Sequence, residues 1–107
     1  MTEEYAVILS YRVWHWLWKN PGKGKEDCPW WDLLEKMHKR CPCCEYYPRG
    51  CKGCILDIID KPLCAGGAYD KWFHDRTNRA ASWYIAVKLR RYARKKEFDF
   101  NIVKEES

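Results

Sequence analysis

Six of the seven cysteines in this chain lie between Cys41 and Cys64, and four of them form two C-x-x-C pairs. These pairs are Cys41/Cys44 and Cys51/Cys54. The two residues inside each pair return the chain toward one point, so that both thiolates can reach the same ion. Two such turns supply the four soft ligands of a tetrahedral zinc site. The spacing therefore predicts a zinc knuckle over residues 41–64, with the rest of the chain packed around it.

More cysteines are present than one zinc ion needs, so two ligand sets stay open. The first set is Cys41, Cys44, Cys51 and Cys54. The second replaces Cys51 with Cys64, because only six residues separate the two pairs and the loop between them is short. We set Cys43 aside, since adjacent thiolates at 43 and 44 rarely serve one ion together.

The expected metal is zinc, and the expected role is structural. Four thiolates close the coordination shell, and the energy of binding such an ion is energy of folding. An iron–sulfur cluster uses the same four ligands and is the alternative cofactor. The odd number of cysteines and their paired spacing favour a metal in a reducing compartment over disulfides.

A cytoplasmic location is expected from the N-terminus and the hydropathy. The first five residues are acidic and lack the basic region and cleavage site of a signal peptide. No apolar run approaches the length of a membrane span. The chain is expected to be a monomer or a homodimer paired through its first helix.

The fold class expected is mainly α, as one small domain of three or four helices over 1–107. A helix over 2–19 is predicted, because Thr2 can cap it, acidic residues follow, and Pro21-Gly22 stops it. A second helix is predicted over 29–40, and C-terminal helices over 69–96. The tail over 98–107 is expected to be frayed.

The first helix carries more apolar surface than one packing face requires. Its tryptophans Trp14, Trp16 and Trp18 can fill the core or form a binding surface for a partner. Near the C-terminus the net charge of +5 is concentrated in one basic segment. This segment holds Lys88, Arg90, Arg91, Arg94, Lys95 and Lys96. Such a segment can bind nucleic acid, or it can be a solvated helix end.

No enzymatic activity is expected. The chain has no Gly-rich phosphate loop, nucleophile elbow or paired-carboxylate motif. Its three histidines lie on a helix surface (His15), beside the knuckle as an alternative ligand (His38), or next to Asp75 (His74). Dithiol redox chemistry needs an exposed thiolate of low pKa, and its usual strand–helix context is not predicted here.

The order of motifs resembles a group of small uncharacterised proteins from bacterial phages and prophages. The resemblance is carried by the aromatic first helix, by Asn-Pro-Gly-Lys-Gly-Lys-Glu-Asp at 20–27, by the C-x-x-C pairs, and by Gly-Gly-Ala-Tyr-x-x-Trp at 66–72. The group usually has Trp at the position of Cys28, and Pro-Leu where this chain has Ile55-Leu56. The resemblance implies a phage origin, a zinc knuckle, and a Cys28 that is a buried small residue rather than a ligand. It implies no mechanism.

Two functions follow as hypotheses. The first is a zinc-binding protein-interaction module that acts on a host protein, for example by inhibiting a host defence system. The alternative is a nucleic-acid-binding protein that uses the 88–96 basic segment together with the knuckle.

Overall fold

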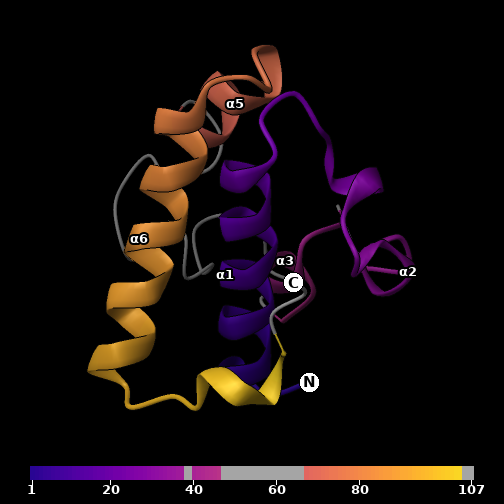
Figure 1. Cartoon of the computed structure of the whole chain (residues 1–107). Helices are drawn as coiled ribbons and strands as arrows, with labels where there is room; N and C mark the ends of the chain where they lie inside the picture. The colour runs from indigo at the N-terminus through magenta and orange to yellow at the C-terminus, as the bar shows by residue number, and fades with distance from the viewer. Residues whose placement is uncertain (38–39, 47–66, 105–107) are drawn as a thin grey trace.

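The computed structural model describes residues 1–37, 40–46 and 67–104, and within them the chain is helical without any strand (Figure 1). The α-helices are α1 (Glu3–Lys19), α2 (Trp31–Leu34), α3 (Pro42–Tyr46), α5 (Ala68–His74) and α6 (Arg79–Lys95). Two short 3-10 helices accompany them, η1 (Lys25–Asp27) and η4 (Phe100–Ile102). The mainly α class is therefore confirmed. Most of the predicted knuckle, residues 47–64, lies outside the described residues.

Helices α1 and α6 run antiparallel and form the main packing unit (Figure 1). Helix α3 packs on α1, and α5 packs on α6 near the end where α1 finishes. Local signals fix the N-terminal ends of both long helices. The Thr2 hydroxyl accepts a hydrogen bond from the Tyr5 amide at 3.0 Å, and the Asn78 side chain accepts one from the Ala81 amide at 3.1 Å. Helix α1 thus coincides with the predicted helix over 2–19 to within one residue.

Trp14 lies in the core and is only 2% exposed. Its ring meets Trp72 edge-on at 4.9 Å and Tyr69 at 5.8 Å between ring centroids, which fixes α5 against α1. The alternative in which Trp14 belongs to a partner-binding surface is therefore wrong, because α5 covers this residue. Trp16 and Trp18 are half-buried.

The predicted helix over 29–40 is wrong in its length. Helix α2 ends at Leu34. It is followed by a turn in which the hydrogen bond joins residues three positions apart, with the Met37 amide donating to the Leu34 carbonyl at 2.9 Å. Arg40 has a left-handed φ of 51°, a conformation that no helix continues. Its carbonyl accepts a hydrogen bond from the Lys25 ammonium at 3.3 Å. Leu33 is 41% exposed whereas Leu34 is buried, so the apolar residues of this helix do not all face the core.

The predicted fraying of 98–107 is also wrong for the described part of the tail. The Arg12 guanidinium donates from Nε to the Val103 carbonyl at 2.9 Å and from Nη2 to the Phe100 carbonyl at 3.0 Å. The Phe100 ring meets Tyr11 edge-on at 5.6 Å, and Val103 is buried. Arg12, in the middle of α1, therefore holds the tail against that helix, and the Glu4 carboxylate in the first turn of α1 accepts from the Asp99 amide at 2.9 Å. The chain after α6 passes the N-terminal end of α1 (Figure 1).

Replacing Arg12 with methionine keeps an aliphatic stem but removes both hydrogen bonds. We expect the free energy of unfolding to fall by about 2 kcal/mol, the usual contribution of hydrogen bonds from a charged donor. Amide hydrogen exchange at Ile102 and Val103 should speed up more than elsewhere. The matched control is Arg94→Met on the exposed end of α6. Unchanged exchange at Ile102 in Arg12→Met would contradict this role.

Candidate metal half-site and aromatic–arginine surface

Cys41, Cys43 and Cys44 lie at the start of α3, which packs against α1. The thiols of Cys43 and Cys44 both hydrogen-bond to the Cys41 sulfur, and the Cys44 backbone N–H donates to the same atom. This turn brings the predicted ligands Cys41 and Cys44 together. An amide N–H directed at a sulfur stabilises the thiolate form, which is the form that binds a metal.

The surroundings of Cys41 favour the thiolate. Hydrogen bonds from Cys43 and Cys44, together with the nearby Lys25 ammonium, hold the pKa of Cys41 well below its usual value, although burial acts in the opposite direction. At Cys28 burial is the main effect and raises the pKa, with a hydrogen bond from the Trp30 backbone as a smaller opposing one. Cys28 therefore remains a buried thiol, in agreement with its expected role as a small core residue.

Cys43 faces a different environment from its neighbours. Its side chain is 0% exposed, and its sulfur lies 3.2 Å from the Ser10 hydroxyl of α1, itself buried. Besides its contact with Cys41, Cys43 is thus part of the packing between α3 and α1. The exclusion of Cys43 from the ligand set stays a prediction.

The remaining predicted ligands, Cys51, Cys54 and Cys64, lie outside the described residues, as does His38. Within residues 1–37, 40–46 and 67–104, no group of three or more His, Cys, Asp or Glu side chains could hold a metal ion. The described residues contain one C-x-x-C turn, in which the sulfurs of Cys41 and Cys44 lie close together. Its donor set fits half of a four-thiolate site.

A second candidate site lies between the end of α1 and the start of α6. We name it the aromatic–arginine surface: a shallow hollow of about 290 Å³ lined by Trp18, Arg79, Ala80 and Trp83. The Trp18 and Trp83 rings lie 4.6 Å apart between centroids. The Arg79 guanidinium lies 5.0 Å from the centre of the Trp18 ring and also donates to the Trp18 carbonyl at 3.1 Å. The Arg90 guanidinium lies 5.5 Å from the centre of the Trp83 ring.

His15 extends this surface along α1. Its ring stacks on Tyr11 at 5.6 Å and lies 5.6 Å from Trp18 between centroids. The rings of Tyr11, His15, Trp18 and Trp83 therefore follow one another along the side of the molecule. Trp16, by contrast, packs against the core cluster and accepts a hydrogen bond on its carbonyl from Asn20.

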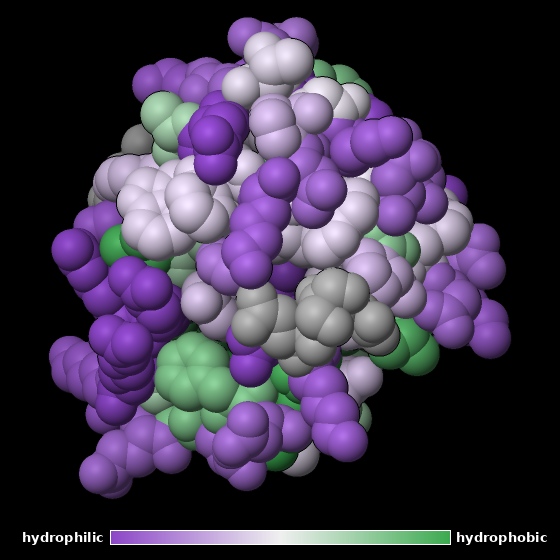
Figure 2. Space-filling view, in the orientation of Figure 1, coloured by the Kyte–Doolittle hydropathy of each residue, from purple (hydrophilic) through white to green (hydrophobic). Residues whose placement is uncertain are grey.

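The predicted basic segment forms the C-terminal half of α6 and the residue after it. Lys88 and Arg90 are half-buried, and Arg91, Arg94, Lys95 and Lys96 are exposed. Lys88 lies 5.3 Å from the centre of the Tyr84 ring, and Lys96 lies 5.6 Å from that of Tyr92. Helix α6 contains six cations and no acidic residue. Hydrophilic side chains accordingly crowd the side of the molecule that this half of α6 occupies (Figure 2).

Three residues of these sites were not singled out from the sequence: Lys25, Arg79 and Trp83. Arg79 and Trp83 are four residues apart, a spacing that places them on one helix face. Their meeting with Trp18 depends on the packing of α6 against α1, which the spacing does not reveal. Lys25 sits in a polar loop, where burial is not expected.

No family model, no curated protein and no solved structure matches this chain. In the described part of the chain, no helix combines the length and the apolar character that crossing a bilayer requires.

The contact between Trp18 and Trp83 can be measured with a double-mutant cycle. We expect Trp18→Ala and Trp83→Ala to be non-additive in unfolding free energy by about 1 kcal/mol, as for other aromatic pairs. The control cycle pairs Trp16→Ala with Trp83→Ala, and it should be additive, because no ring contact joins Trp16 to Trp83. Additivity in the Trp18 cycle would show that the two rings do not interact in solution.

Proposed function

We propose that this chain is a small zinc-binding protein-interaction module whose aromatic–arginine surface binds an acidic surface of a partner protein. The observation that carries the proposal is the Trp18–Trp83 ring pair with Arg79 beside it, at the rim of a hollow. Tryptophan and arginine are the residues most enriched among those that dominate binding energy at protein interfaces. No residue is assigned a catalytic role.

The rings are already held in place before a partner arrives. Trp18 is fixed by Arg79 and His15, and Trp83 by Arg90, so binding would immobilise few additional rotamers. The hollow offers space for one side chain of the partner as an anchor. Because α6 carries only positive charges, an acidic partner surface would be complementary to it.

The zinc part of the proposal concerns stability. Cys41 and Cys44 would supply two thiolates, and Cys54 with either Cys51 or Cys64 would supply the others. Closing such a site would tie α3 to the following segment, and the energy of metal binding would contribute to folding. An iron–sulfur cluster on the same thiolates is the alternative.

If the resemblance to the phage group holds, a host protein is the natural partner for a small chain in which no catalytic motif is recognised. Inhibition of a host defence system is one form of this activity, and the host cytoplasm would be its location. Homodimers would be compatible with the proposal as long as the aromatic–arginine surface stays free.

Nucleic-acid binding is the second candidate, and one observation favours it. Basic side chains on α6 alternate with aromatic rings, as in Lys88 beside Tyr84 and Arg90 beside Trp83. Cations can neutralise phosphates, and exposed rings can stack on bases. Against this candidate, Trp83 is already engaged with Trp18, so its ring is not free to stack on a base.

The zinc site is tested by comparing two neighbouring cysteines. We expect native mass spectrometry to find one zinc ion per chain, retained by Cys43→Ser. Cys44→Ser should lose zinc affinity by more than the ~10–100-fold that the loss of a supporting hydrogen bond costs. A chelator should lower the melting temperature of Cys43→Ser but not that of Cys44→Ser.

Equal zinc content in both variants would contradict Cys44 as a ligand. Iron and inorganic sulfide in the purified protein, with visible absorption, would assign the thiolates to a cluster instead. Cysteines paired as disulfides would overturn both metal alternatives.

The partner chemistry is tested by selecting binders from a random peptide display library on the immobilised protein. We expect the selected peptides to combine Asp or Glu with one aromatic or branched apolar residue. Trp83→Ala should weaken a selected peptide by about 30-fold, the effect of losing a residue that dominates an interface, and Arg79→Glu should also weaken it. Lys71→Glu on α5 makes the same charge change away from the surface and serves as control.

Two outcomes would overturn this assignment. One is the selection of peptides without acidic residues, or of peptides that bind Trp83→Ala as well as the unaltered protein. The other is a salt-sensitive shift of labelled DNA or RNA that is lost in Arg91→Glu/Arg94→Glu but kept in Arg79→Glu, which would favour the nucleic-acid function.

A further inference from the structure

A separate pocket of about 140 Å³ lies on another side of the core, where η1, α2 and α5 meet. Its lining includes three cations, Lys25, Arg40 and Arg76, and one carboxylate, Glu26. Aromatic walls come from Trp31 and Trp72. The pocket is separate from the aromatic–arginine surface, and it shares Lys25 with the surroundings of Cys41.

Lys25 is a buried cation, with 8% of its surface exposed. Its ammonium lies 5.4 Å from the centre of the Trp14 ring and 5.1 Å from that of Tyr69, and it donates to the Arg40 carbonyl. Within the described residues no carboxylate pairs with it. Buried charges are normally paired, since a carbonyl and two ring faces compensate only part of the lost hydration. Cys41, whose thiolate Lys25 favours, is one such partner, and an anion in the pocket would add a second.

Trp72 also lines this pocket, and its indole carries an unused donor. The residue is 2% exposed, and its indole N–H is buried without a hydrogen-bond partner in the part of the chain that the structure describes. Buried indole N–H groups usually find an acceptor, because leaving one unpaired is costly. The Arg76 guanidinium lies 5.4 Å from the centre of this ring, which adds positive charge near the unused donor.

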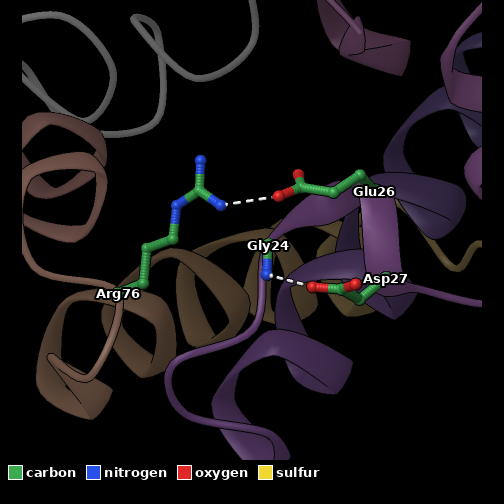
Figure 3. A network of polar contacts seen from close by, with 4 residues as sticks. All are labelled: Gly24, Glu26, Asp27 and Arg76. Atoms are coloured by element: carbon green, nitrogen blue, oxygen red, sulfur yellow. Dashed lines mark hydrogen bonds and ion pairs between the residues drawn. The ribbon is translucent and has the colours of Figure 1, made fainter.

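The rim of the pocket is a polar network built close to the backbone (Figure 3). Arg76 pairs with Glu26 at 2.8 Å, and the Asp27 carboxylate accepts from the Gly24 amide at 3.0 Å. A Cβ at position 24 would overlap both the Arg76 guanidinium and the Glu26 carboxylate, so glycine leaves the space in which this pair forms. Hydrogen bonds from its own backbone and from Arg76 lower the pKa of Glu26. With Glu26 ionised, the three cations still leave two positive charges at the pocket.

We propose that this pocket binds an oxyanion, a phosphate or a carboxylate carried by a small molecule, with the Trp72 N–H as one donor and the Lys25 ammonium as the charge partner. The volume limits the ligand, because a cavity of about 150 Å³ holds a single benzene ring. The pocket therefore accepts one anionic group with at most one ring beside it, and the aromatic walls favour a planar ring. A whole nucleotide does not fit inside.

The indole N–H signals of a ¹⁵N-labelled sample test this directly, and Trp72→Phe identifies the signal of Trp72. We would titrate inorganic phosphate, acetate, phenyl phosphate and benzoate, with sodium chloride holding the ionic strength constant. The Trp72 signal should move in a saturable way, together with that of Trp31 in the same pocket, while the indole signals of the other tryptophans stay in place. Saturation by phosphate but not acetate would assign a phosphate ligand, and the reverse a carboxylate. Tighter binding of the phenyl compounds would assign a ring to the ligand.

Charge variants provide the second readout. Arg76→Gln should weaken the best anion by about tenfold, as expected for one charge-assisted hydrogen bond, and Lys25→Gln by at least as much. Lys71→Gln, an exposed cation on the same helix as Trp72, is the matched control and should change nothing. Arg76 lies at the half-exposed rim, so its variant is informative even where Lys25→Gln does not fold.

The proposal is overturned if the Trp72 signal does not move with any of the four anions. It is equally overturned if all indole signals move together, or if Lys71→Gln weakens binding as much as Arg76→Gln. None of these outcomes depends on the partner of the aromatic–arginine surface.

Discussion

The burial of α1 is the constraint on which the other elements depend. A run from Ala6 to Tyr11 is buried without interruption, so several faces of this helix need cover. Helix α6 covers one side, α3 another, and α5 is fixed by the contact of Trp72 with Trp14. The tail is held by Arg12. Each candidate site borders one of these contacts, so the packing around α1 sets the geometry of each site.

Cations and aromatic rings are paired throughout the described structure. Some of these pairs lie near the surface and others are buried. Arg79 on Trp18 and Arg90 on Trp83 lie at the surface, where such contacts hold rings in place for a partner. Lys25 between Trp14 and Tyr69 is buried, where the same contact leaves a charge short of compensation. The first arrangement suits recognition of an acidic protein surface, and the second suits a small anion.

Sequence reasoning predicted the elements whose signals are local. The helix over 2–19 has its cap, acidic first turn and proline stop within the sequence, and the last helix has Asn78 as its cap. It failed where distant contacts decide. The helix over 29–40 stops early, with Arg40 in a left-handed conformation and held through its carbonyl by Lys25. The tail over 98–104 is held by Arg12, which lies some ninety positions earlier in the chain. No local sequence pattern predicts such a contact.

The sequence by itself determined the helical class, the pairing of Cys41 with Cys44 and the basic character of α6, because these depend on residues within a few positions of each other. Only the tertiary structure decided which tryptophans are fully buried. Trp14 and Trp18 share a helix face by spacing, yet α5 buries Trp14 and α6 brings Trp83 to Trp18. It also decided that Lys25, from a polar loop, is a buried charge. The physical reason is the same in both cases: burial depends on which surfaces meet, and that is fixed by packing between elements distant in sequence.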